Sequence, residues 1–334
     1  MAYRVLIIGC GAIAGGYDAE RSLDDWPLSH AGAIARNERF ELAACVDPDD
    51  TARAAFAARW GVPTNTASLE KLDAAPGDYE LIVIASPTTH HAEHLEWALS
   101  MQPKAVFCEK PLAKDYDQIA PIERAFRDAG IALAVNYTRR WAPDINALVE
   151  GVRNDDWGEL LSAAGTYSKG VVHNGTHMVD LMMMFAGPLA VQSVGPAVAD
   201  FWEDDPTVSA ILTAVNSGAP LHLVAGDSEW ITQFELVLSY QFGEIAIRDG
   251  GMRIETRDVG DSATVAGYRQ LGLPQSVPGR YAQAMSLAYE DMARVITSKG
   301  KSVPAWSEKN GFAAHAICEE IRLTALESLK KDSE

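Results

Sequence analysis

Short apolar runs alternate with stretches of helical periodicity over the first 135 residues of the chain. The apolar runs have the length of buried strands and cover Tyr3–Ile8, Glu41–Val46, Leu81–Ala85, Ala105–Cys108 and Ile131–Val135. Apolar residues recur at helical spacing in the intervening stretches Asp49–Trp60, His91–Met101 and Tyr116–Ala129. This alternation is typical of parallel βαβ units and predicts an α/β domain with a doubly wound parallel sheet, a Rossmann fold.

From about Leu160 the pattern changes to successive runs of alternating apolar and polar residues. These runs are Ser162–Tyr167, Val191–Ala199, Val208–Val215, Leu221–Ala225, Phe234–Tyr240 and Glu244–Arg248. Two helical stretches follow, 281–298 and 307–330, separated by Gly300 and Pro304. The order predicts an α+β domain with a mixed, largely antiparallel open sheet. We therefore expect a dinucleotide-binding domain at 1–135 and a substrate-binding and oligomerisation domain at 136–334, with the option that the C-terminal helices pack back on the first domain.

Composition narrows the class of protein. The chain has 334 residues, no stretch of about 18 consecutive apolar residues, and four cysteines without C-x-x-C spacing. These features favour a cytoplasmic protein with reduced, buried thiols. A formal net charge of −18 opposes binding to nucleic acid, because neutralising phosphates needs clustered Lys and Arg. An anionic ligand must therefore be held by local groups.

A glycine-rich segment follows the first predicted strand directly. Residues 9–15, Gly-Cys-Gly-Ala-Ile-Ala-Gly, match G-x-G-x-x-G/A in the context that signals a dinucleotide. The first glycine permits a tight turn, the second lets the backbone approach a pyrophosphate, and a following helix would offer free N–H groups. We predict that this loop binds the cofactor through Gly9, Gly11, Ala12 and Ile13.

An acidic residue, Asp47, ends the second predicted strand. A carboxylate there can accept hydrogen bonds from the ribose hydroxyls and repels a 2′-phosphate, which favours NAD over NADP. Asp47 lies 38 residues after Gly9, whereas the usual interval is about 20. The excess maps to Tyr17–Leu28, which we interpret as an excursion inside the first βα connection, followed by a helix capped by Ser29. The alternative is that Asp47 is an ordinary turn residue.

Three further motifs follow predicted strands, where ligands bind in open α/β sheets. They are Ser86-Pro87-Thr88-Thr89-His90-His91, Cys108-Glu109-Lys110-Pro111 and Asn136-Tyr137-Thr138-Arg139-Arg140-Trp141. Together with the glycine loop they resemble the Gfo/Idh/MocA family of NAD(P)-dependent sugar and polyol oxidoreductases. The resemblance is close in the first domain and loose in the second.

The resemblance implies that Lys110 is the catalytic lysine and that the bond to Pro111 is cis. An ammonium beside a sugar hydroxyl and the positively charged nicotinamide can have a lowered pKa and then shuttle the hydroxyl proton. The alternative is a surface lysine in a turn.

A polar segment at the start of a predicted helix contains two histidines. The family often has an Asp four residues before a catalytic His; here His177 matches that His, but His173 occupies the Asp position. A neutral imidazole at 173 could orient substrate or relay protons, but it could not stabilise a protonated His177 as a carboxylate would. Zinc binding by the two histidines is an alternative, and without a third ligand of suitable spacing we predict no metal.

The remaining contacts are assigned by the same resemblance and by side-chain chemistry. Cofactor contacts besides the glycine loop are expected from Asp47, Ser86, Thr88, His91, Glu109, Lys110 and Asn136. Substrate contacts are expected from Lys110, Asn136, Arg139, Trp141, His173, Asn174 and His177. His90 and His94 are expected on a helix surface, and Met182, Met183 and Met184 in the core.

These features predict an NAD-dependent dehydrogenase or reductase that transfers a hydride between the nicotinamide and a secondary alcohol or ketone carbon. The substrate would be a sugar, polyol, sugar acid or nucleotide sugar, and the family resemblance implies a homodimer or homotetramer. Because the sequence has no long apolar stretch, we expect no membrane partner. One alternative is an NAD-dependent glycoside hydrolase or lyase that oxidises its substrate transiently. A second alternative is a non-catalytic ligand sensor on the same fold.

Overall fold

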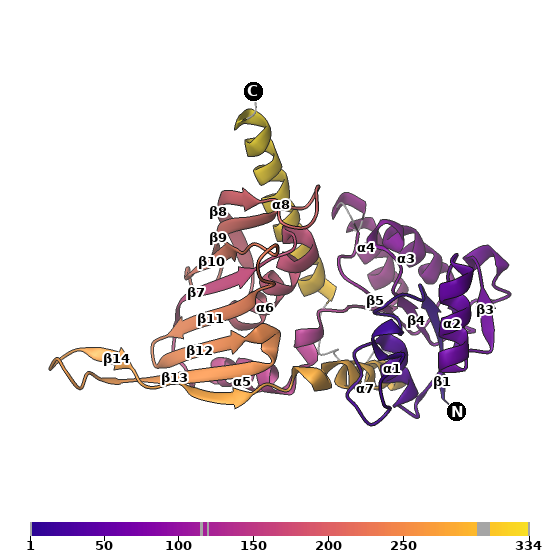
Figure 1. The fold of residues 1–334 in the computed structure, drawn as a ribbon, viewed down its shortest axis with the longest axis horizontal. Coiled ribbons are helices and arrows are strands. Elements are labelled where there is room, and N and C mark those ends of the chain that lie inside the picture. Colours follow the sequence, from indigo (N-terminus) through magenta and orange to yellow (C-terminus); the bar gives the residue numbers. More distant parts are fainter. Residues whose placement is uncertain (1, 114–115, 119, 299–307, 333–334) are drawn as a thin grey trace. The chain divides into compact units, whose positions relative to one another are not determined.

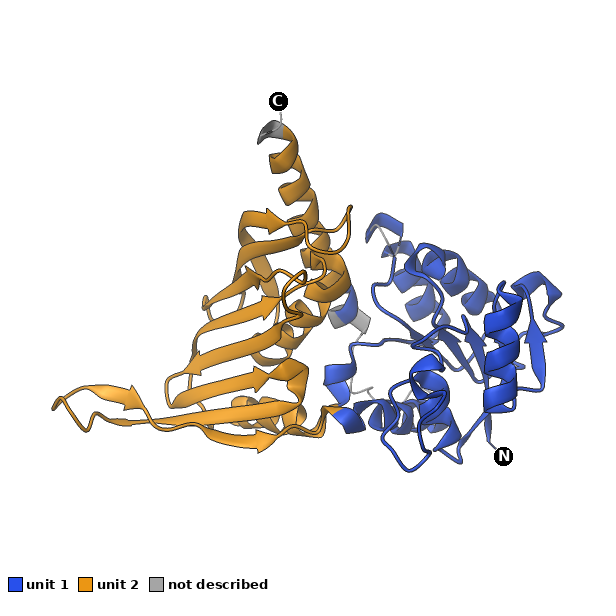
Figure 2. Cartoon of the chain, in the orientation of Figure 1, with its two compact units in different colours: residues 1–141, 282–312 blue, residues 142–281, 313–334 orange. Residues whose placement is uncertain are grey.

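A computed structural model describes residues 2–113, 116–118, 120–298 and 308–332 (Figure 1). The chain divides into unit 1, residues 1–141 and 282–312, and unit 2, residues 142–281 and 313–334 (Figure 2). Unit 1 thus takes in residues 136–141 and the helix α7 (Ala284–Thr297), both of which lie beyond the predicted boundary at residue 135. The predicted break at Gly300 and Pro304 lies outside the described residues.

The sheet of unit 1 is parallel, with strand order β3-β2-β1-β4-β5-β6. Its strands are β1 (Tyr3–Ile8), β2 (Phe40–Val46), β3 (Thr64–Thr66), β4 (Leu81–Ile84), β5 (Ala105–Cys108) and β6 (Ala132–Val135). Its helices besides α7 are α1 (His30–Ala35), α2 (Asp50–Trp60), α3 (His91–Ser100) and α4 (Ala120–Ala129). The predicted Rossmann fold is confirmed. Strand order reverses between β1 and β4, and ligands of such sheets bind at that switch point, outside the carboxyl ends of the strands.

Helices cover both faces of this sheet. On one face Leu95 of α3 and Phe126 of α4 join a buried apolar cluster with side chains of every strand from β1 to β6 except β3. On the other face the ring of Phe107 in β5 lies 5.8 Å from that of Tyr289 in α7. The strand β3 was missed by the sequence analysis because three polar residues at a sheet edge carry no apolar pattern.

The sheet of unit 2 has the order β14-β13-β12-β11-β7-β10-β9-β8, with β15 paired to β13. Only the β7/β10 pair is parallel, so the predicted mixed, largely antiparallel sheet is confirmed. The strands are β7 (Leu160–Tyr167), β8 (Leu189–Val198), β9 (Thr207–Ala214), β10 (Pro220–Ala225), β11 (Phe234–Tyr240), β12 (Gly243–Arg248), β13 (Arg253–Asp261), β14 (Arg269–Leu271) and β15 (Gln275–Pro278). The remaining helices are α5 (Pro143–Arg153), α6 (Thr176–Ala186) and α8 (Glu308–Asp332).

Close packing of α6 on the sheet depends on a glycine in β7. A Cβ at Gly165 would lie 2.5 Å from the sulfur of Met178 and 2.6 Å from the methyl of Met182. Met182 and Met183 are buried, which confirms their predicted place in the core, whereas Met184 is only partly buried. The four cysteines are free and buried, as expected. Within the described residues, no helix combines the length and apolar character needed to span a bilayer.

Candidate cofactor and substrate site

The turn after β1 has the glycines that a dinucleotide requires. Gly9 has a φ of +97°, and a Cβ there would lie 2.6 Å from the backbone of Ala85, so the fold itself requires glycine at this position. Gly11 is exposed, has no positive φ, and a Cβ there would meet nothing within 4 Å. Because nothing in the protein requires Gly11 to lack a side chain, the open space over it suits a pyrophosphate that must approach the backbone.

The glycine turn continues into α1 across the predicted excursion. The carbonyl oxygens of Ile13 and Ala14 accept hydrogen bonds from the backbone N–H groups of His30 and Ala31, at 3.0 and 2.8 Å. Residues 11–15 and α1 are thus joined end to end by backbone hydrogen bonds, and residues 16–28 loop out between them. The excursion is confirmed, and so is the Ser29 cap, whose side chain accepts from the N–H of Gly32.

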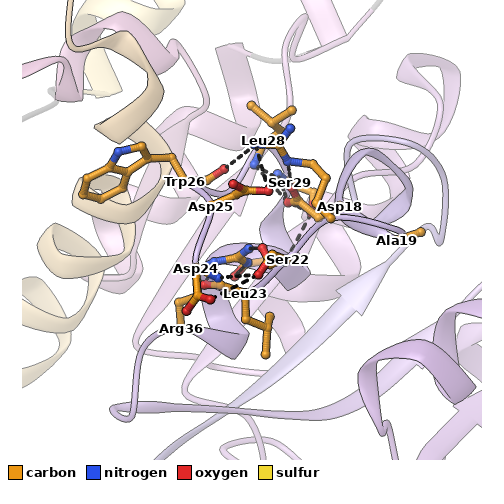
Figure 3. Close-up of polar contacts among 12 residues, drawn as sticks. Asp18, Ala19, Ser22, Leu23, Asp24, Asp25, Trp26, Leu28, Ser29 and Arg36 are labelled. Carbon is orange, nitrogen blue, oxygen red and sulfur yellow. Dashed lines mark hydrogen bonds and ion pairs between the residues drawn. The ribbon is translucent and has the colours of Figure 1, made fainter.

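The excursion is held closed by a buried carboxylate, Asp18 (Figure 3). Asp18 accepts hydrogen bonds from the N–H of Leu28 at 2.9 Å, the N–H of Ser29 at 2.8 Å and the hydroxyl of Ser29 at 2.5 Å. Arg36 of α1 donates to the carbonyls of Ser22 and Leu23 on the far side of the loop. The segment is therefore an Ω-type loop whose ends are pinned by polar contacts, with Trp26 half exposed.

Asp47 lies at the end of β2 and contacts the glycine turn directly. Its Oδ2 accepts a hydrogen bond from the N–H of Cys10 at 2.7 Å, and its Oδ1 accepts from the N–H of Asp49 at 2.8 Å. A pocket of about 400 Å³ lies beside it, lined by residues of the glycine turn, β2 and the loop after β4, among them Gly9, Asp47 and Ser86. The pocket, the open surface at Gly11 and the carboxylate of Asp47 fit an adenine dinucleotide.

The Ser86–His91 segment departs from its predicted role at His91. This imidazole is only 1% exposed, and its two nitrogens lie 2.8 Å from the carbonyl oxygens of Pro111 and Ser86. The prediction that its side chain contacts the cofactor is therefore wrong; His91 joins the loops after β4 and β5, and its burial lowers its pKa. His90 and His94, expected on a helix surface, both line the pocket, and His94 Nδ1 lies 2.9 Å from the hydroxyl of Ser86. Thr88 is partly buried and begins the 3-10 turn Thr88–His90 that precedes α3.

Lys110 follows β5 and is joined to Pro111 by a cis peptide bond, as the resemblance implied. Its neighbour Glu109 is buried, and its Oε1 lies 2.8 Å from His30 Nε2 and accepts from Asn136 Nδ2 at 2.6 Å. The other nitrogen of His30 lies 2.9 Å from the hydroxyl of Tyr289. Burial raises the pKa of Glu109, but its hydrogen bonds with His30 and Asn136 and the charges of His30 and Lys110 outweigh this effect, so the net pKa is lowered. The side chains of Glu109 and Asn136 therefore join the loops beside Lys110 through a hydrogen bond. Because the side chain of Glu109 is engaged in this way, only its backbone is available to contact the cofactor.

The segment after β6 corrects a second prediction. Trp141 is only 3% exposed, its ring packs 5.5 Å from that of Phe107, and its Nε1 donates to Asp291 of α7. The ring is thus covered by its own unit and has no face for a sugar. Arg140 is also buried, so of the two arginines only Arg139, which is partly exposed, remains a candidate for substrate.

The two predicted histidines lie in unit 2, at the start of α6. A π-helical turn, Val171–Gly175, contains His173 and Asn174, and His177 follows in the first turn of α6. All three side chains are partly exposed. Asn174 Nδ2 donates to the carbonyl of Ser168 at 2.9 Å. Among the described residues no group of three His, Cys, Asp or Glu side chains is arranged to hold a metal ion.

The sequence analysis missed the main partner of His173. Asp205, from the loop between β8 and β9, places its Oδ2 2.7 Å from His173 Nδ1, and the ring of Trp202 from the same loop stacks on the imidazole at 4.3 Å. The loop is an acidic, aperiodic stretch distant in sequence, and nothing in it distinguishes Asp205 from Glu203 or Asp204.

Comparison with known proteins supports the cofactor site. Residues 3–137 match the family model described as "Oxidoreductase family, NAD-binding Rossmann fold". Inositol 2-dehydrogenase from Rhizobium meliloti (strain 1021) is 30% identical over 131 residues, 39% of this chain and 38% of that protein. D-glucoside 3-dehydrogenase from Escherichia coli (strain K12) is 28% identical over 210 residues, 57% of this chain and 56% of that protein. The chain thus matches about two fifths to a little over half of the length of these relatives.

Solved structures resemble the whole chain in fold. A UDP-N-acetylglucosamine 3-dehydrogenase from Acidithiobacillus ferrooxidans superposes with a TM-score of 0.75 at 18% identity, over 98% of this chain and 99% of that one. An oxidoreductase from Agrobacterium radiobacter in complex with NAD+, L-tartaric acid and magnesium superposes with a TM-score of 0.72 at 17% identity, over 98% of this chain and 97% of that one. A 3-ketoreductase from Actinomadura kijaniata in complex with NADP superposes with a TM-score of 0.72 at 17% identity, over 97% of both chains. At such identities the likeness establishes the fold.

Proposed function

We propose that this chain, whose residues 3–137 match the model of the Gfo/Idh/MocA oxidoreductase family, is an NAD-dependent dehydrogenase of a secondary alcohol carbon in a sugar, polyol, sugar acid or nucleotide sugar. The observation that carries the proposal is the edge of the unit 1 sheet. There the open turn at Gly11, the carboxylate of Asp47 and the lysine after β5 all follow the carboxyl ends of parallel strands. This is the arrangement in which a bound nicotinamide meets an acid–base group.

NAD, when bound, supplies the hydride acceptor, and the residues of the chain supply binding and proton transfer. The carboxylate of Asp47 accepts hydrogen bonds from the ribose hydroxyls and repels a 2′-phosphate. For this reason we propose NAD rather than NADP as the cofactor. Lys110 and His177 move the proton of the substrate hydroxyl, while Arg139, His173 and Asn174 orient the substrate. Asn136, which was expected to contact cofactor and substrate, is only 1% exposed and holds Glu109 beside Lys110 instead.

The decisive experiment measures NADH formation across a panel of sugars, polyols, sugar acids and nucleotide sugars, with NAD+ and NADP+ compared. Lys110→Met should abolish turnover with the best substrate while NADH still binds. Lys104→Met is the matched control, because Lys104 is an exposed lysine that pairs with Glu80. Turnover retained in Lys110→Met would refute the assignment.

The same assay separates the alternatives. A hydrolase or lyase with transient oxidation would release product without net accumulation of NADH, and a sensor would bind ligand without turnover. We also propose that the enzyme acts in the cytoplasm on a small-molecule substrate, as a homodimer or homotetramer. Light scattering coupled to size-exclusion chromatography tests that assembly.

A further inference from the structure

His30, the first residue of α1, is held at both nitrogens of its ring. The side chain is fully buried, Nδ1 lies 2.9 Å from the hydroxyl of Tyr289, and Nε2 lies 2.8 Å from Oε1 of Glu109. The pKa of Glu109 is lowered, so its carboxylate is ionised at neutral pH and can only accept hydrogen bonds. Nε2 of His30 therefore carries a proton in either charge state of the ring and donates to Glu109.

The backbone of His30 is anchored as well as its ring. Its N–H donates to the carbonyl of Ile13 in the glycine turn at 3.0 Å. The preceding residue, Ser29, is held through its N–H and its hydroxyl by the buried carboxylate of Asp18 (Figure 3). The ring of His30 also packs edge to face against that of Phe107 in β5, with the ring centroids 5.0 Å apart. His30 therefore links the glycine turn to the loop after β5.

Glu109 is a buried carboxylate that keeps its charge because of its hydrogen bonds. It is 8% exposed, and Asn136 Nδ2 donates to the same oxygen as His30, at 2.6 Å. Burial raises the pKa of Glu109, and the hydrogen bond from His30 is the largest of the effects that lower it. Loss of this donor would therefore favour the neutral carboxyl group, because a buried charge without its partners is poorly solvated.

Other titratable groups interact with Glu109 from α7, β5 and α3 and from the neighbouring residue Lys110. Burial raises the pKa of Tyr289 and of Cys108 well above their ordinary values, so both groups stay protonated at neutral pH. Burial lowers the pKa of His91, so its ring is neutral there. The charge of Lys110 is among the effects that lower the pKa of Glu109. Because the interaction of two charges is mutual, the carboxylate in turn favours the ammonium form of Lys110.

We propose that His30 is a positioning residue for Lys110: it keeps Glu109 ionised, and this fixed negative charge sets the pH above which Lys110 accepts the proton of the substrate hydroxyl. Asn136 and Tyr289 complete the network that holds the charge. The consequence for catalysis rests on the proposed function, whereas the effect of Glu109 on Lys110 exists without substrate. When the charge is removed, Lys110 loses its proton at lower pH, and the enzyme stays active in more acidic solution.

The first experiment measures the protonation of Lys110 without substrate. Trace labelling with acetic anhydride modifies the neutral amine, and peptide mass spectrometry gives the labelling rate of each lysine of the full chain as a function of pH. In Glu109→Gln the pH midpoint for Lys110 should fall by about 0.5–1.5 units, because a negative charge is removed from a poorly solvated neighbour. The exposed Lys104 is the internal reference, and its midpoint should stay in place. An unchanged midpoint for Lys110 would overturn the inference.

Two substitutions of His30 separate its contacts. The amide nitrogen of His30→Gln takes the place of Nε2 and still donates to Glu109, whereas that of His30→Asn reaches only the place of Nδ1. His30→Asn should therefore move the midpoint of Lys110 in the same direction as Glu109→Gln, and His30→Gln should bring it back toward the wild-type value. Equal midpoints in the two His30 variants would refute the role of His30. The result for His30→Asn also decides the question if Glu109→Gln does not fold.

The second experiment records the pH profile of kcat with the best substrate of the panel. The acidic limb should move to lower pH in Glu109→Gln and in His30→Asn, whereas a purely structural role would lower kcat without moving the limb. The matched control is Glu80→Gln, which removes a carboxylate that pairs with the exposed Lys104 and should leave the limb in place. If the wild type is active and the limb stays in place in both variants, the inference falls and the proposed function stands. If the wild type turns over no member of the panel, the proposed function fails, and the labelling midpoints alone decide whether His30 controls the charge state of Lys110.

Discussion

The two glycines of the turn after β1 should respond in opposite ways to the same substitution. Gly11→Ala adds a Cβ into space that is empty to 4 Å, at a residue without positive φ, so the free protein should keep its stability or gain about 0.4–1 kcal/mol from the stiffer unfolded chain. Gly9→Ala adds a Cβ 2.6 Å from the Ala85 backbone at a φ of +97°. The left-handed backbone strain of about 1–2 kcal/mol and the steric clash together should lower the free energy of unfolding by at least about 2 kcal/mol.

Binding of the cofactor should separate the two variants further. If a pyrophosphate lies over Gly11, a methyl group there forces it away from the backbone and weakens charge-assisted hydrogen bonds of about 1.5–3 kcal/mol, which corresponds to a Kd for NADH raised about 10- to 100-fold. Titration of NADH by fluorescence gives the Kd, and thermal unfolding without cofactor gives Tm. Gly9→Ala should lower Tm by about 4–8 °C, at 2–4 °C per kcal/mol. A Gly11→Ala protein that binds NADH within twofold of the wild type would refute the placement of the pyrophosphate.

Three further predictions concern the carboxylates of unit 1. Glu109→Gln should lower the free energy of unfolding by about 2–4 kcal/mol near pH 7, because it removes the charge that His30 and Asn136 contact. The folded pKa of Glu109 is depressed, so this stability is present above the ordinary pKa of about 4.3 and is lost as the pH falls through the folded value. In urea unfolding, the difference in unfolding free energy between the wild type and Glu109→Gln should therefore shrink as the pH falls through the lowered pKa of Glu109. A difference that does not change with pH would count against the network. Asp47→Ser should raise the ratio of kcat/KM for NADP+ over NAD+ at least about tenfold, and an unchanged ratio would remove Asp47 from the ribose site. Asp18→Ala should lower the free energy of unfolding by at least about 2 kcal/mol and make the 16–28 loop sensitive to trypsin at Arg21. Unchanged proteolysis would show that the loop closes without the carboxylate of Asp18.

Much of unit 1 could be predicted because parallel strands that are buried on both faces consist of consecutive apolar residues. The strands β1, β2, β4, β5 and β6 lie within a residue of their expected ends for this reason. In the candidate site, the sequence led to Gly9 and Asp47, which both line the pocket, because each stands at a fixed place directly after a strand. The short edge strand β3 and the strands β13 to β15 were missed, because polar or half-exposed residues carry little periodicity.

Two side chains with the right chemistry were misjudged because exposure is set by packing. Trp141 and His91 could each have contacted a ligand. Instead, Phe107 and Asp291 cover the indole of Trp141. The two nitrogens of His91 lie within hydrogen-bond distance of the backbone carbonyls of Pro111 and Ser86. Neither outcome is encoded near the residue itself, since the groups responsible come from other elements of the fold.

The sequence by itself determined the fold class, the glycine turn after β1 and the position of Lys110 after β5, because each follows from short-range patterning of apolar residues, glycines and strand ends. Only the tertiary structure decided that a carboxylate 32 residues away orients His173, and that Glu109 belongs to a buried network with His30 and Tyr289. Such pairings depend on which segments the completed sheets bring together, and the free energy that selects them comes from burial and hydrogen bonds between residues far apart in the chain.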